Sequence, residues 1–486
     1  MQMVRVRAIN RNEESCSKEC SQDVSRVQRN MDPQEHPLER AKEYQRALNA
    51  VKLRKVFAKP FVRALEHEDG VTCLGRSPVR VNCLVAGAAD GEAKVWDVAE
   101  GRCLRVLGGH KGAVRAVAVS QDGEVCVTAS QDGTARLWRV PFAPPKPGPL
   151  GGEWGGDEDE DEGEGGSGSG FRSSGSAAKG RLRGPEAAPA AEYAASGALR
   201  GADHHWTRPR FATCGAEVLL WDHERSEPVS RYSWGADTVA SVRFNPAEPD
   251  LLAGAGSDRS ITLYDVRASN APLRKIVMQT KPSCLSWNPQ EAFHLTAGND
   301  DGRLYTHDLR QLAKPRAIHE GFVSAVTDVD WAPTGVEFVA AGYDRSLRIF
   351  RKDAPHARDV YTTKRMQRVA ATRFSADATY VFSGSDDMNV RVWKADASAK
   401  LGVLLPREKK SLAYADALVK RHAHLPEMRR ILGHKHLPAP LYRAEKKRQI
   451  QIDADRKKEK NVKDHAPKDA PEEKPYKERR VIAELE

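Results

Sequence analysis

The sequence lacks the features that define several classes of protein. Its 486 residues contain no apolar run close to the roughly 20 residues that a membrane-spanning helix needs, which predicts no membrane segment and no membrane partner. The N-terminal residues contain no apolar stretch, which predicts no secretory signal. A Walker loop, an HExxH motif and a Ser-centred elbow are also missing. We therefore expect a protein that is not an enzyme and uses no cofactor.

Cysteine is present but follows no disulfide or metal-binding pattern. The chain has eight cysteines and no CxxC pair. Most of them stand beside Val, Leu or Thr in strand-like runs, so we expect free thiols buried in a core, in a reducing compartment. The neighbouring His204 and His205 could suggest zinc, but they supply only two ligands, and we expect no metal site.

The positive charge is concentrated at the two ends of the chain. Lys and Arg number 77 against 67 Asp and Glu, a formal net charge of +10. Residues 407–486 contain 22 basic and 14 acidic residues, and residues 1–61 contain 13 basic and 8 acidic residues. The segment between them is close to neutral, so the basic ends are the candidates for binding polyanions.

A repeat organises the middle of the chain. Aromatic side chains end short apolar runs about 43 residues apart, at Trp96, Trp138, Trp221, Tyr264, Phe350 and Trp393. A seventh unit lies at 302–308, and one interval is about forty residues longer than the rest. Apolar–polar alternation favours strands, and four short strands per unit are typical of a WD40 blade. The sequence thus predicts an all-β fold, a seven-bladed WD40 β-propeller, with a basic N-terminal extension and a helical, basic C-terminal extension.

Most of these units also have an aspartate near a predicted turn. In such blades the turn Asp, a His from the preceding loop and the strand aromatic commonly form a local hydrogen-bond set. We therefore interpret one group of residues as structural: His110, Asp132, Trp138, Asp258, His319, Asp344 and Asp386. The third unit lacks a recognisable turn Asp, which predicts a distorted blade.

The composition divides the chain into three parts. Residues 1–61 form the N-terminal extension, 62–406 the propeller and 407–486 the C-terminal domain. Within the propeller, 141–202 reads as a mostly disordered acidic and Gly/Ser insertion, in which seven of the eight residues at 157–164 are acidic. This acidic tract either solvates a loop or mimics nucleic acid toward basic partners.

The N-terminal extension contains a predicted helix from Glu39. Its apolar stripe, which includes Tyr44, Val51 and Leu53, either packs on the propeller edge or binds a partner. In the C-terminal domain, basic clusters are candidates for contacts with RNA or with an assembly, although a solvated helix face would look the same. The candidates are Arg429, Arg430, His434, Lys435, His436, Lys446, Lys447, Arg448, Arg456, Lys457 and Lys458.

Several motifs outside the generic blade pattern resemble the Sof-like family of WD40 proteins. They are ArgAsnMetAspPro (29–33), GluTyrGlnArgAlaLeuAsnAla (43–50), ValPheAlaLysProPhe (56–61), AspHisHisTrp (203–206), PheAlaThrCysGly (211–215), AsnProGlnGluAlaPhe (288–293), ThrLysArgMetGln (363–367), LeuGlyValLeu (401–404) and HisLysHisLeuPro (434–438). The resemblance covers nearly the whole chain except the first residues and the insertion. One departure is LeuGlyHisLysHisLeuPro, where the family usually has Arg-His-Arg-His-Leu-Pro.

The resemblance implies a non-catalytic scaffold in the nucleus and nucleolus. Such proteins belong to the small-subunit processome and associate with the U3 small nucleolar ribonucleoprotein during pre-rRNA cleavage and 18S rRNA maturation. The implied partners are processome proteins, pre-rRNA and U3 small nucleolar RNA.

The same resemblance leaves a second function open, because the human member is also described as a cullin-4 ligase-associated factor. The alternative is a substrate receptor of a cullin-4 RING E3 ubiquitin ligase. Such receptors carry a Trp/Tyr-Asp-x-Arg box, and two segments fit it here, with adaptor contacts expected at Tyr264, Asp265, Arg267, Asp308 and Arg310. The other interpretation is that these residues cap the ends of strands.

Overall fold

The computed structural model describes residues 38–139, 187–233, 238–267, 272–465 and 477–485. The chain forms two compact units. One is helical and combines the N-terminal segment up to Phe57 with Lys400–His434. The other comprises Ala58–Ala399 and the chain from Lys435 onward. No helix among the described residues has the length and apolar character needed to cross a membrane.

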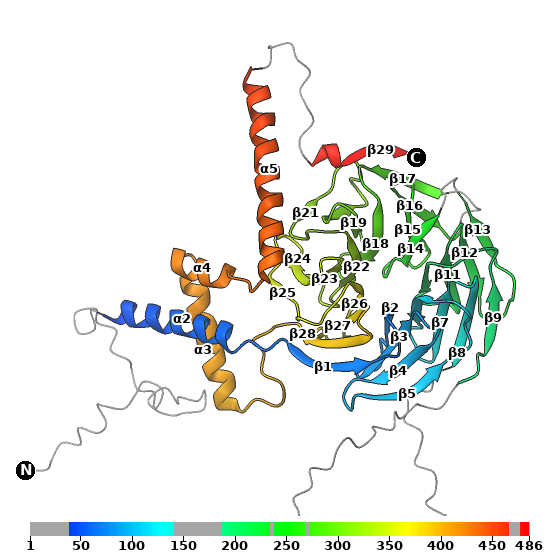
Figure 1. The fold of residues 1–486 in the computed structure, drawn as a ribbon, viewed down its shortest axis with the longest axis horizontal. Helices are drawn as coiled ribbons and strands as arrows, with labels where there is room; N and C mark the ends of the chain where they lie inside the picture. The colour runs from blue at the N-terminus through cyan, green and yellow to red at the C-terminus, as the bar shows by residue number, and fades with distance from the viewer. Residues whose placement is uncertain (1–37, 140–186, 234–237, 268–271, 466–476, 486) are drawn as a thin grey trace, which may run out of the picture. The chain divides into compact units, whose positions relative to one another are not determined.

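The larger unit is built from seven antiparallel sheets around a central axis (Figure 1), which confirms the predicted seven-bladed β-propeller. Blade 1 contains β2 (Val71–Arg76), β3 (Cys83–Ala88), β4 (Ala93–Asp97) and β5 (Arg102–Leu107). Blade 2 contains β6 (Val114–Val119), β7 (Val125–Ser130), β8 (Thr134–Arg139) and β9 (Ala191–Ala194). Blade 3 contains β10 (Gly201–His204), β11 (Arg210–Cys214), β12 (Val218–Asp222) and β13 (Ser230–Tyr232).

The remaining blades follow the same plan. Blade 4 contains β14 (Val239–Phe244), β15 (Leu251–Gly256), β16 (Ser260–Asp265) and β17 (Pro272–Met278). Blade 5 contains β18 (Pro282–Trp287), β19 (His294–Asn299), β20 (Leu304–Asp308) and β21 (Ala317–His319). Blade 6 contains β22 (Val326–Trp331), β23 (Glu337–Gly342), β24 (Leu347–Arg351) and β25 (Asp359–Tyr361). Blade 7 contains β26 (Val369–Phe374), β27 (Tyr380–Ser385), β28 (Asn389–Lys394) and β1 (Phe61–Glu66).

Strands far apart in the sequence close the ring in blade 7. β1 pairs antiparallel with β28, so the first and last strands of the propeller lie in one sheet. The ring of Phe61 packs edge-on against Trp393, with centroids 5.7 Å apart. The middle strands show why closure matters: every residue of β3 and of β19 is buried, because neighbouring blades cover both faces.

The structure corrects the predicted end of the insertion and the predicted distortion of the third blade. The predicted insertion at 141–202 includes β9 and the start of β10, and Tyr193 and Leu199 within it are buried in the propeller. The acidic tract at 157–164 lies outside the described residues. Blade 3 has regular antiparallel pairing despite its missing turn Asp, since a turn at Gly215 connects β11 to β12 through a hydrogen bond from the Gly215 amide to the Glu217 carbonyl.

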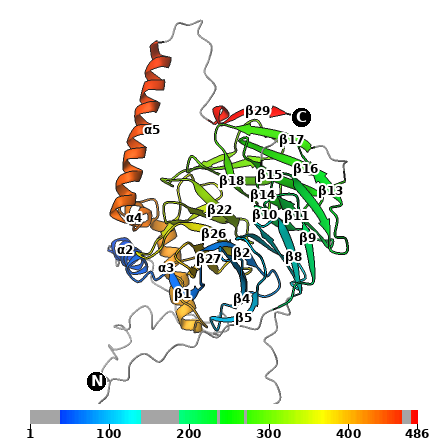
Figure 2. The ribbon, with the colours of Figure 1, turned by 45° about the vertical axis from the view of Figure 1, so that its right-hand side comes forward.

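The predicted C-terminal domain 407–486 is divided between the two units. Within the propeller unit, α5 (Ala439–His465) lies against blades 5 and 6, where the Arg448 guanidinium donates hydrogen bonds to the backbone carbonyls of Asp301 and Phe322. After the 3₁₀ turn η2 (Glu478–Arg480), β29 (Val481–Leu485) adds a fifth strand to blade 4 by pairing with β17, beside which it runs in Figure 2.

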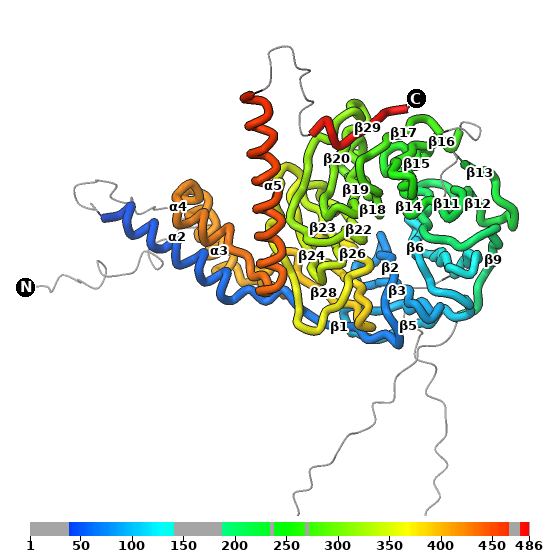
Figure 3. The backbone as a smooth tube through the Cα atoms, turned by 45° about the horizontal axis from the view of Figure 1, so that its top comes forward, coloured from blue at the N-terminus to red at the C-terminus, as the bar shows by residue number. Residues whose placement is uncertain are grey.

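Three helices form the other unit: α2 (Glu39–Val56), α3 (Pro406–His422) and α4 (Pro426–Gly433), which lie together in Figure 3. Proline at the first position of α3 and of α4 suits a helix start, because the missing amide needs no partner there. The core contains Ala47, Val51, Leu418, Val419 and Met428. The apolar stripe of α2 therefore packs on α3 and α4. The sequence had suggested the propeller edge or a binding partner instead.

The fifth blade has an unusual residue at its aromatic position. In blades 2, 3 and 7 a buried tryptophan there donates its indole hydrogen to a hydroxyl, for example Trp138 to Thr128 at 2.9 Å. Blade 5 has His307 instead, which is fully buried, with both ring nitrogens lacking a hydrogen-bond partner. Burial lowers the pKa of His307 to about 4.

We predict that His307→Phe stabilises the protein and reduces its sensitivity to acid. The unfolded imidazole, with a pKa of about 6.5, binds protons that the folded His307 rejects down to about pH 4, so stability is complete above pH 6.5 and decreases as the pH falls toward 4. Removing an unsatisfied buried polar group should add about 1–2 kcal/mol to the free energy of unfolding at pH 7. Urea titrations at several pH values measure both effects, and the exposed His436→Phe serves as a control. An unchanged pH dependence would contradict the assignment.

Tight turns between the second and third strands of the blades require a left-handed backbone. Three of them have glycine at the critical position, with φ between 73° and 89°: Gly91, Gly133 and Gly302. Three others have a side chain there, with φ between 62° and 67°: Arg259, Arg345 and Met388. In the sixth blade Asp344 holds the turn by accepting hydrogen bonds from the amide and hydroxyl of Ser346.

We predict that Arg345→Gly raises the free energy of unfolding by about 0.5–1 kcal/mol. The left-handed conformation costs an L-residue about 1–2 kcal/mol, and the greater entropy of glycine in the unfolded chain offsets part of that gain. The reciprocal control, Gly133→Ala in a turn with φ of 84°, should lower stability by about 1 kcal/mol. Chemical denaturation compares both variants with the parent. A destabilised Arg345→Gly protein would mean that the Arg345 side chain makes a stabilising contact.

Candidate interaction surfaces

The polar set of blade 2 lies in the interior. His110 accepts or donates at three places: its Nδ1 lies 3.3 Å from Asp132 and its Nε2 lies 2.8 Å from Thr128, whose hydroxyl also receives the indole hydrogen of Trp138. Its third contact is with the Thr134 hydroxyl, 3.1 Å from Nδ1. Burial lowers the pKa of His110, which favours the neutral ring. This set joins β7, β8 and the turn between them to the loop of His110, and it presents no reactive group.

We predicted that His319 has the same place in blade 6 as His110 has in blade 2, and this prediction was wrong. His319 instead contacts the Ala354 carbonyl at 2.7 Å and the Thr306 hydroxyl at 3.3 Å. Phe322 occupies the loop position that His110 has in blade 2. In blade 2 the amide of the residue after His110 donates to the turn Asp132, and in blade 6 the amide of Val323, the residue after Phe322, donates to the turn Asp344. The apolar ring of Phe322 packs in the core and under the Arg348 guanidinium, 5.0 Å away.

The other two turn aspartates bind cations next to their own turns. Asp258 lies 2.6 Å from the Lys275 ammonium and also accepts from Ser260. Asp386 receives a hydrogen bond from the Arg368 guanidinium at 2.7 Å. Both carboxylates thus have partners within the propeller.

The segment 264–267 presents one exposed cation at the end of a strand. Tyr264 is buried, and burial raises the pKa of its hydroxyl to about 12. The Asp265 side chain caps the strand end by accepting from the Arg267 amide at 2.9 Å. The Arg267 side chain is 69% exposed, with Nε 3.6 Å from Asp250. The strand-capping geometry is therefore present, and Arg267 remains accessible to a partner.

In the equivalent segment of blade 5, residues 307–310, the arginine side chain makes more contacts within the propeller. Arg310 forms a bidentate pair with Asp308, with N–O distances of 3.1 and 3.0 Å, and its guanidinium lies 4.1 Å from the centre of the Phe293 ring. The hydrogen bond from Arg310 lowers the pKa of Asp308. The Arg310 side chain is still 65% exposed. Blades 4 and 5 thus present one exposed arginine each, at the same end of neighbouring third strands.

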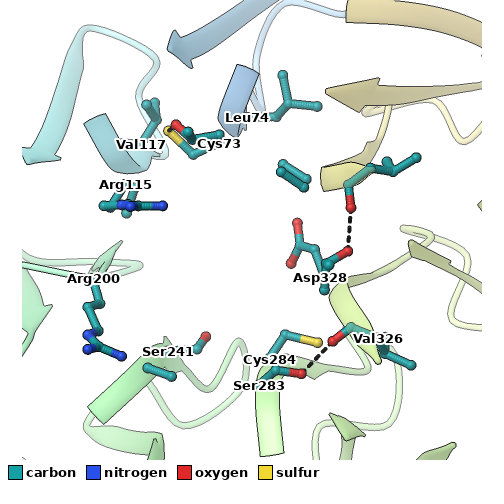
Figure 4. Close-up of a pocket in the computed structure, with 18 of the residues that line it drawn as sticks. Cys73, Leu74, Arg115, Val117, Arg200, Ser241, Ser283, Cys284, Val326 and Asp328 are labelled. Atoms are coloured by element: carbon teal, nitrogen blue, oxygen red, sulfur yellow. Dashed lines mark hydrogen bonds between the residues drawn. The ribbon is translucent and has the colours of Figure 1, made fainter. Parts of the chain in front are cut away.

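A central channel of about 980 Å³ runs between the innermost strands (Figure 4). Hydroxyl groups on its wall join adjacent blades: Ser283 donates to the Val326 carbonyl at 2.5 Å, and Thr327 donates to the Val369 carbonyl at 2.6 Å. Cys73 also lines the channel, and burial raises the pKa of its thiol to about 12. Hydroxyl groups of this wall are thus used for contacts between blades, and the buried thiol of Cys73 is not an activated nucleophile.

The AspHisHisTrp stretch is also structural. Asp203 accepts from the Phe244 amide at 2.7 Å and lies 3.4 Å from Arg243 of the next blade. The Nε2 atoms of His204 and His223 lie 3.1 Å apart, and burial lowers the pKa of both rings. No group of three or more potential metal ligands occurs in the described part of the chain.

The basic candidates of the C-terminal segment do not form one surface. Arg429, Arg430 and His434 are exposed in the helical unit, whereas the others belong to the propeller unit. On α5 the exposed candidates are Lys446, Lys447, Arg456, Lys457 and Lys458; His436 is exposed before the helix and Lys435 is half-buried. Arg448 is an intramolecular contact, since it bonds to carbonyls of blades 5 and 6, and this candidate was therefore wrong.

Sequence reasoning missed the contacts that assemble the helical unit. Arg54 of α2 pairs with Asp416 of α3, and Glu43 of α2 pairs with Arg421 of α3 at 3.0 Å. The hydroxyl of Tyr44 donates to Glu427 at 2.6 Å. These partners are more than 360 residues apart. The only sequence signal was that both segments are basic and have helical periodicity.

Comparison with known proteins covers nearly the whole chain. The Sof1-like domain matches residues 395–481, and the WD domain, G-beta repeat matches 59–97, 101–139, 313–351 and 360–394. The chain is 41% identical over 464 residues to DDB1- and CUL4-associated factor 13 of Danio rerio, covering 95% of this chain and 96% of that protein. The Homo sapiens protein of the same name is 39% identical over 459 residues, covering 94% of each.

A fungal relative extends the comparison. Protein SOF1 of Saccharomyces cerevisiae is 36% identical over 450 residues, covering 90% of this chain and 86% of that protein. Similarity at this level spans the N-terminal helix, all blades and the C-terminal helices, including the parts that generic propellers lack. The chain belongs to the Sof1-like family of WD-repeat proteins.

Proposed function

We propose that the protein is a non-catalytic scaffold in the nucleolar small-subunit processome, needed for pre-rRNA processing, 18S rRNA maturation and small ribosomal subunit biogenesis. The observation that supports the proposal is that the propeller and the basic helices differ in their polar groups. Interior polar groups such as those of His110 and Thr327 form hydrogen bonds within the propeller, with His307 as an exception. The exposed cations are concentrated on helices joined to it.

Such an architecture suits assembly rather than turnover. A rigid propeller offers wide protein-binding surfaces, and basic helices offer charge to RNA phosphates. The proposed partners are processome proteins, pre-rRNA and U3 small nucleolar RNA. Similarity to Protein SOF1 across 90% of the chain supports this function.

A second candidate function is substrate reception for a cullin-4 ubiquitin ligase. Two observations favour it. Relatives from fish to human have the name DDB1- and CUL4-associated factor 13. Arg267 and Arg310 are exposed after the third strands of neighbouring blades, where a guanidinium can make bidentate contacts with an adaptor.

Rapid depletion of the protein tests the scaffold function. We expect 18S rRNA to fall while the large-subunit rRNA persists, and we expect the tagged full chain to co-sediment with pre-ribosomal particles. Depletion is preferable to truncation, because removing 407–486 would take α3 and α4 from α2 and expose Ala47 and Val51. Normal 18S rRNA after depletion, or sedimentation only in light fractions, would contradict the proposal.

Binding to purified DDB1 tests the ligase function. The double variant Arg267→Ala/Arg310→Ala should bind at least tenfold more weakly, since interface arginines commonly contribute about 2 kcal/mol. Arg351→Ala is the matched control, because Arg351 is 62% exposed near the end of the third strand of blade 6. Equal affinity of the double variant and the parent would reject these residues as the contact.

A further inference from the structure

The helical unit contains most of the excess positive charge of the protein. Its described segments, 38–57 and 400–434, include 14 basic and 5 acidic residues. The whole chain has a net charge of +10, so these segments alone account for nearly all of it. A small folded body built from both ends of the chain therefore has a net charge of +9 in its described segments, and residues 435–465 contribute a further +5.

The acidic residues of this body serve its own assembly. Glu43 pairs with Arg421, Asp416 with Arg54, and Glu408 lies 3.4 Å from Lys400. Glu427 accepts the hydrogen bond of the Tyr44 hydroxyl. Four of the five carboxylates thus have a partner within this body, three of them across α2, α3 and α4, and the field that reaches solvent is positive.

One face of α3 concentrates this charge in an ordered way. Leu418 and Val419 point into the core. On the opposite face, Lys409, Ala413, Ala417 and Lys420 recur at helical spacing, and all four are exposed. At 1.5 Å per residue the two lysines are about 16 Å apart along the axis, with small side chains between them.

The other two helices of this body present further exposed cations. Arg429 and Arg430 of α4 are exposed and follow the fully buried Met428. Lys42 and Lys52 of α2 are exposed on either side of the buried Ala47 and Val51. Their Cα positions are fixed by packing, so a ligand would meet a preorganised array of charge.

We propose that the helical unit is a phosphate-binding surface for RNA, with the Lys409–Lys420 face of α3 as its centre. The choice of RNA as the polyanion rests on the proposed function. The surface chemistry favours a nucleic acid over a protein, because lysine is depleted from protein interfaces and the alanines between the lysines offer no anchor side chain. Lysine ammonium groups bind phosphates as point charges, so we expect binding that does not depend on the base sequence of the RNA.

The test is RNA binding by the full chain, measured by fluorescence anisotropy with a labelled 30-nucleotide single-stranded RNA of mixed sequence. The variant is Lys409→Gln/Lys410→Gln/Lys420→Gln, which removes the two lysines of this face and the adjacent exposed Lys410. We expect affinity to fall about tenfold or more near physiological salt. The slope of log affinity against log salt should decrease by about 0.7 for each lost phosphate contact.

The matched control is Lys111→Gln/Arg225→Gln/Lys314→Gln, which removes three exposed cations from propeller loops and should leave affinity within twofold. Equal losses in both triple variants would overturn the inference by showing a general effect of charge. Binding by the α3 variant that equals that of the parent would also overturn it, and would leave a protein partner as the ligand of this face. If 18S rRNA falls on depletion but the purified parent binds no RNA, this inference fails while the proposed scaffold function stands.

Discussion

Closure of the ring is the constraint on which the propeller depends. A four-stranded sheet has two apolar faces, and it can bury both only between two neighbours. β1 meets this need by pairing with β28, so the segment that follows the helical unit completes the last blade. Arg63 of β1 extends the closure by donating to the Ala99 carbonyl of the first blade at 3.0 Å. Without this strand, blade 7 would have an open edge, and the outer side of Trp393 would lose the Phe61 ring.

Hydrogen bonds and ion pairs between the innermost strands hold neighbouring blades together around the axis. Asp328 of β22 accepts from the Thr372 amide at 3.0 Å and pairs with Arg373 of the next blade at 2.8 Å. Asp330 accepts from the Phe374 amide at 2.8 Å and lies 3.6 Å from Arg76 of the blade after that. Buried charges are tolerated when each has a partner and its remaining lone pairs are hydrogen-bonded. These two aspartates and their cationic partners therefore hold blades 6, 7 and 1 together at the axis.

The chain also uses its C-terminal segments to cover surfaces that the repeat leaves open. β29 pairs with β17 and occupies an edge that would otherwise be free to pair with another chain. Arg448 of α5 satisfies two turn carbonyls of blades 5 and 6. The cations on the outer side of α5 and those of the helical unit belong to two separately packed bodies. The basic C-terminal segment that the sequence suggests as one domain therefore forms two surfaces, one on the helical unit and one on the propeller unit.

The sequence by itself determined the repeat and what it entails. Aromatic residues such as Trp138 at regular intervals, with alternation before them, identify seven blades, because periodicity is a local property of strands. It also located the two exposed arginines, since Arg267 and Arg310 follow strand ends in a short motif. The family motifs outside the blades were recognisable for the same reason, as contiguous strings of residues.

Only the tertiary structure decided which distant segments share a core. Tyr44 and Glu427 are 383 residues apart, and their hydrogen bond is encoded in no local pattern. Likewise His319 stands at a plausible spacing, yet Phe322 fills the position, because a shift of three residues in a loop leaves the strand pattern unchanged. The role of Arg448 was hidden because an arginine looks the same in sequence whether it faces solvent or a carbonyl. Pairing across the chain is a matter of packing, and packing depends on the whole fold.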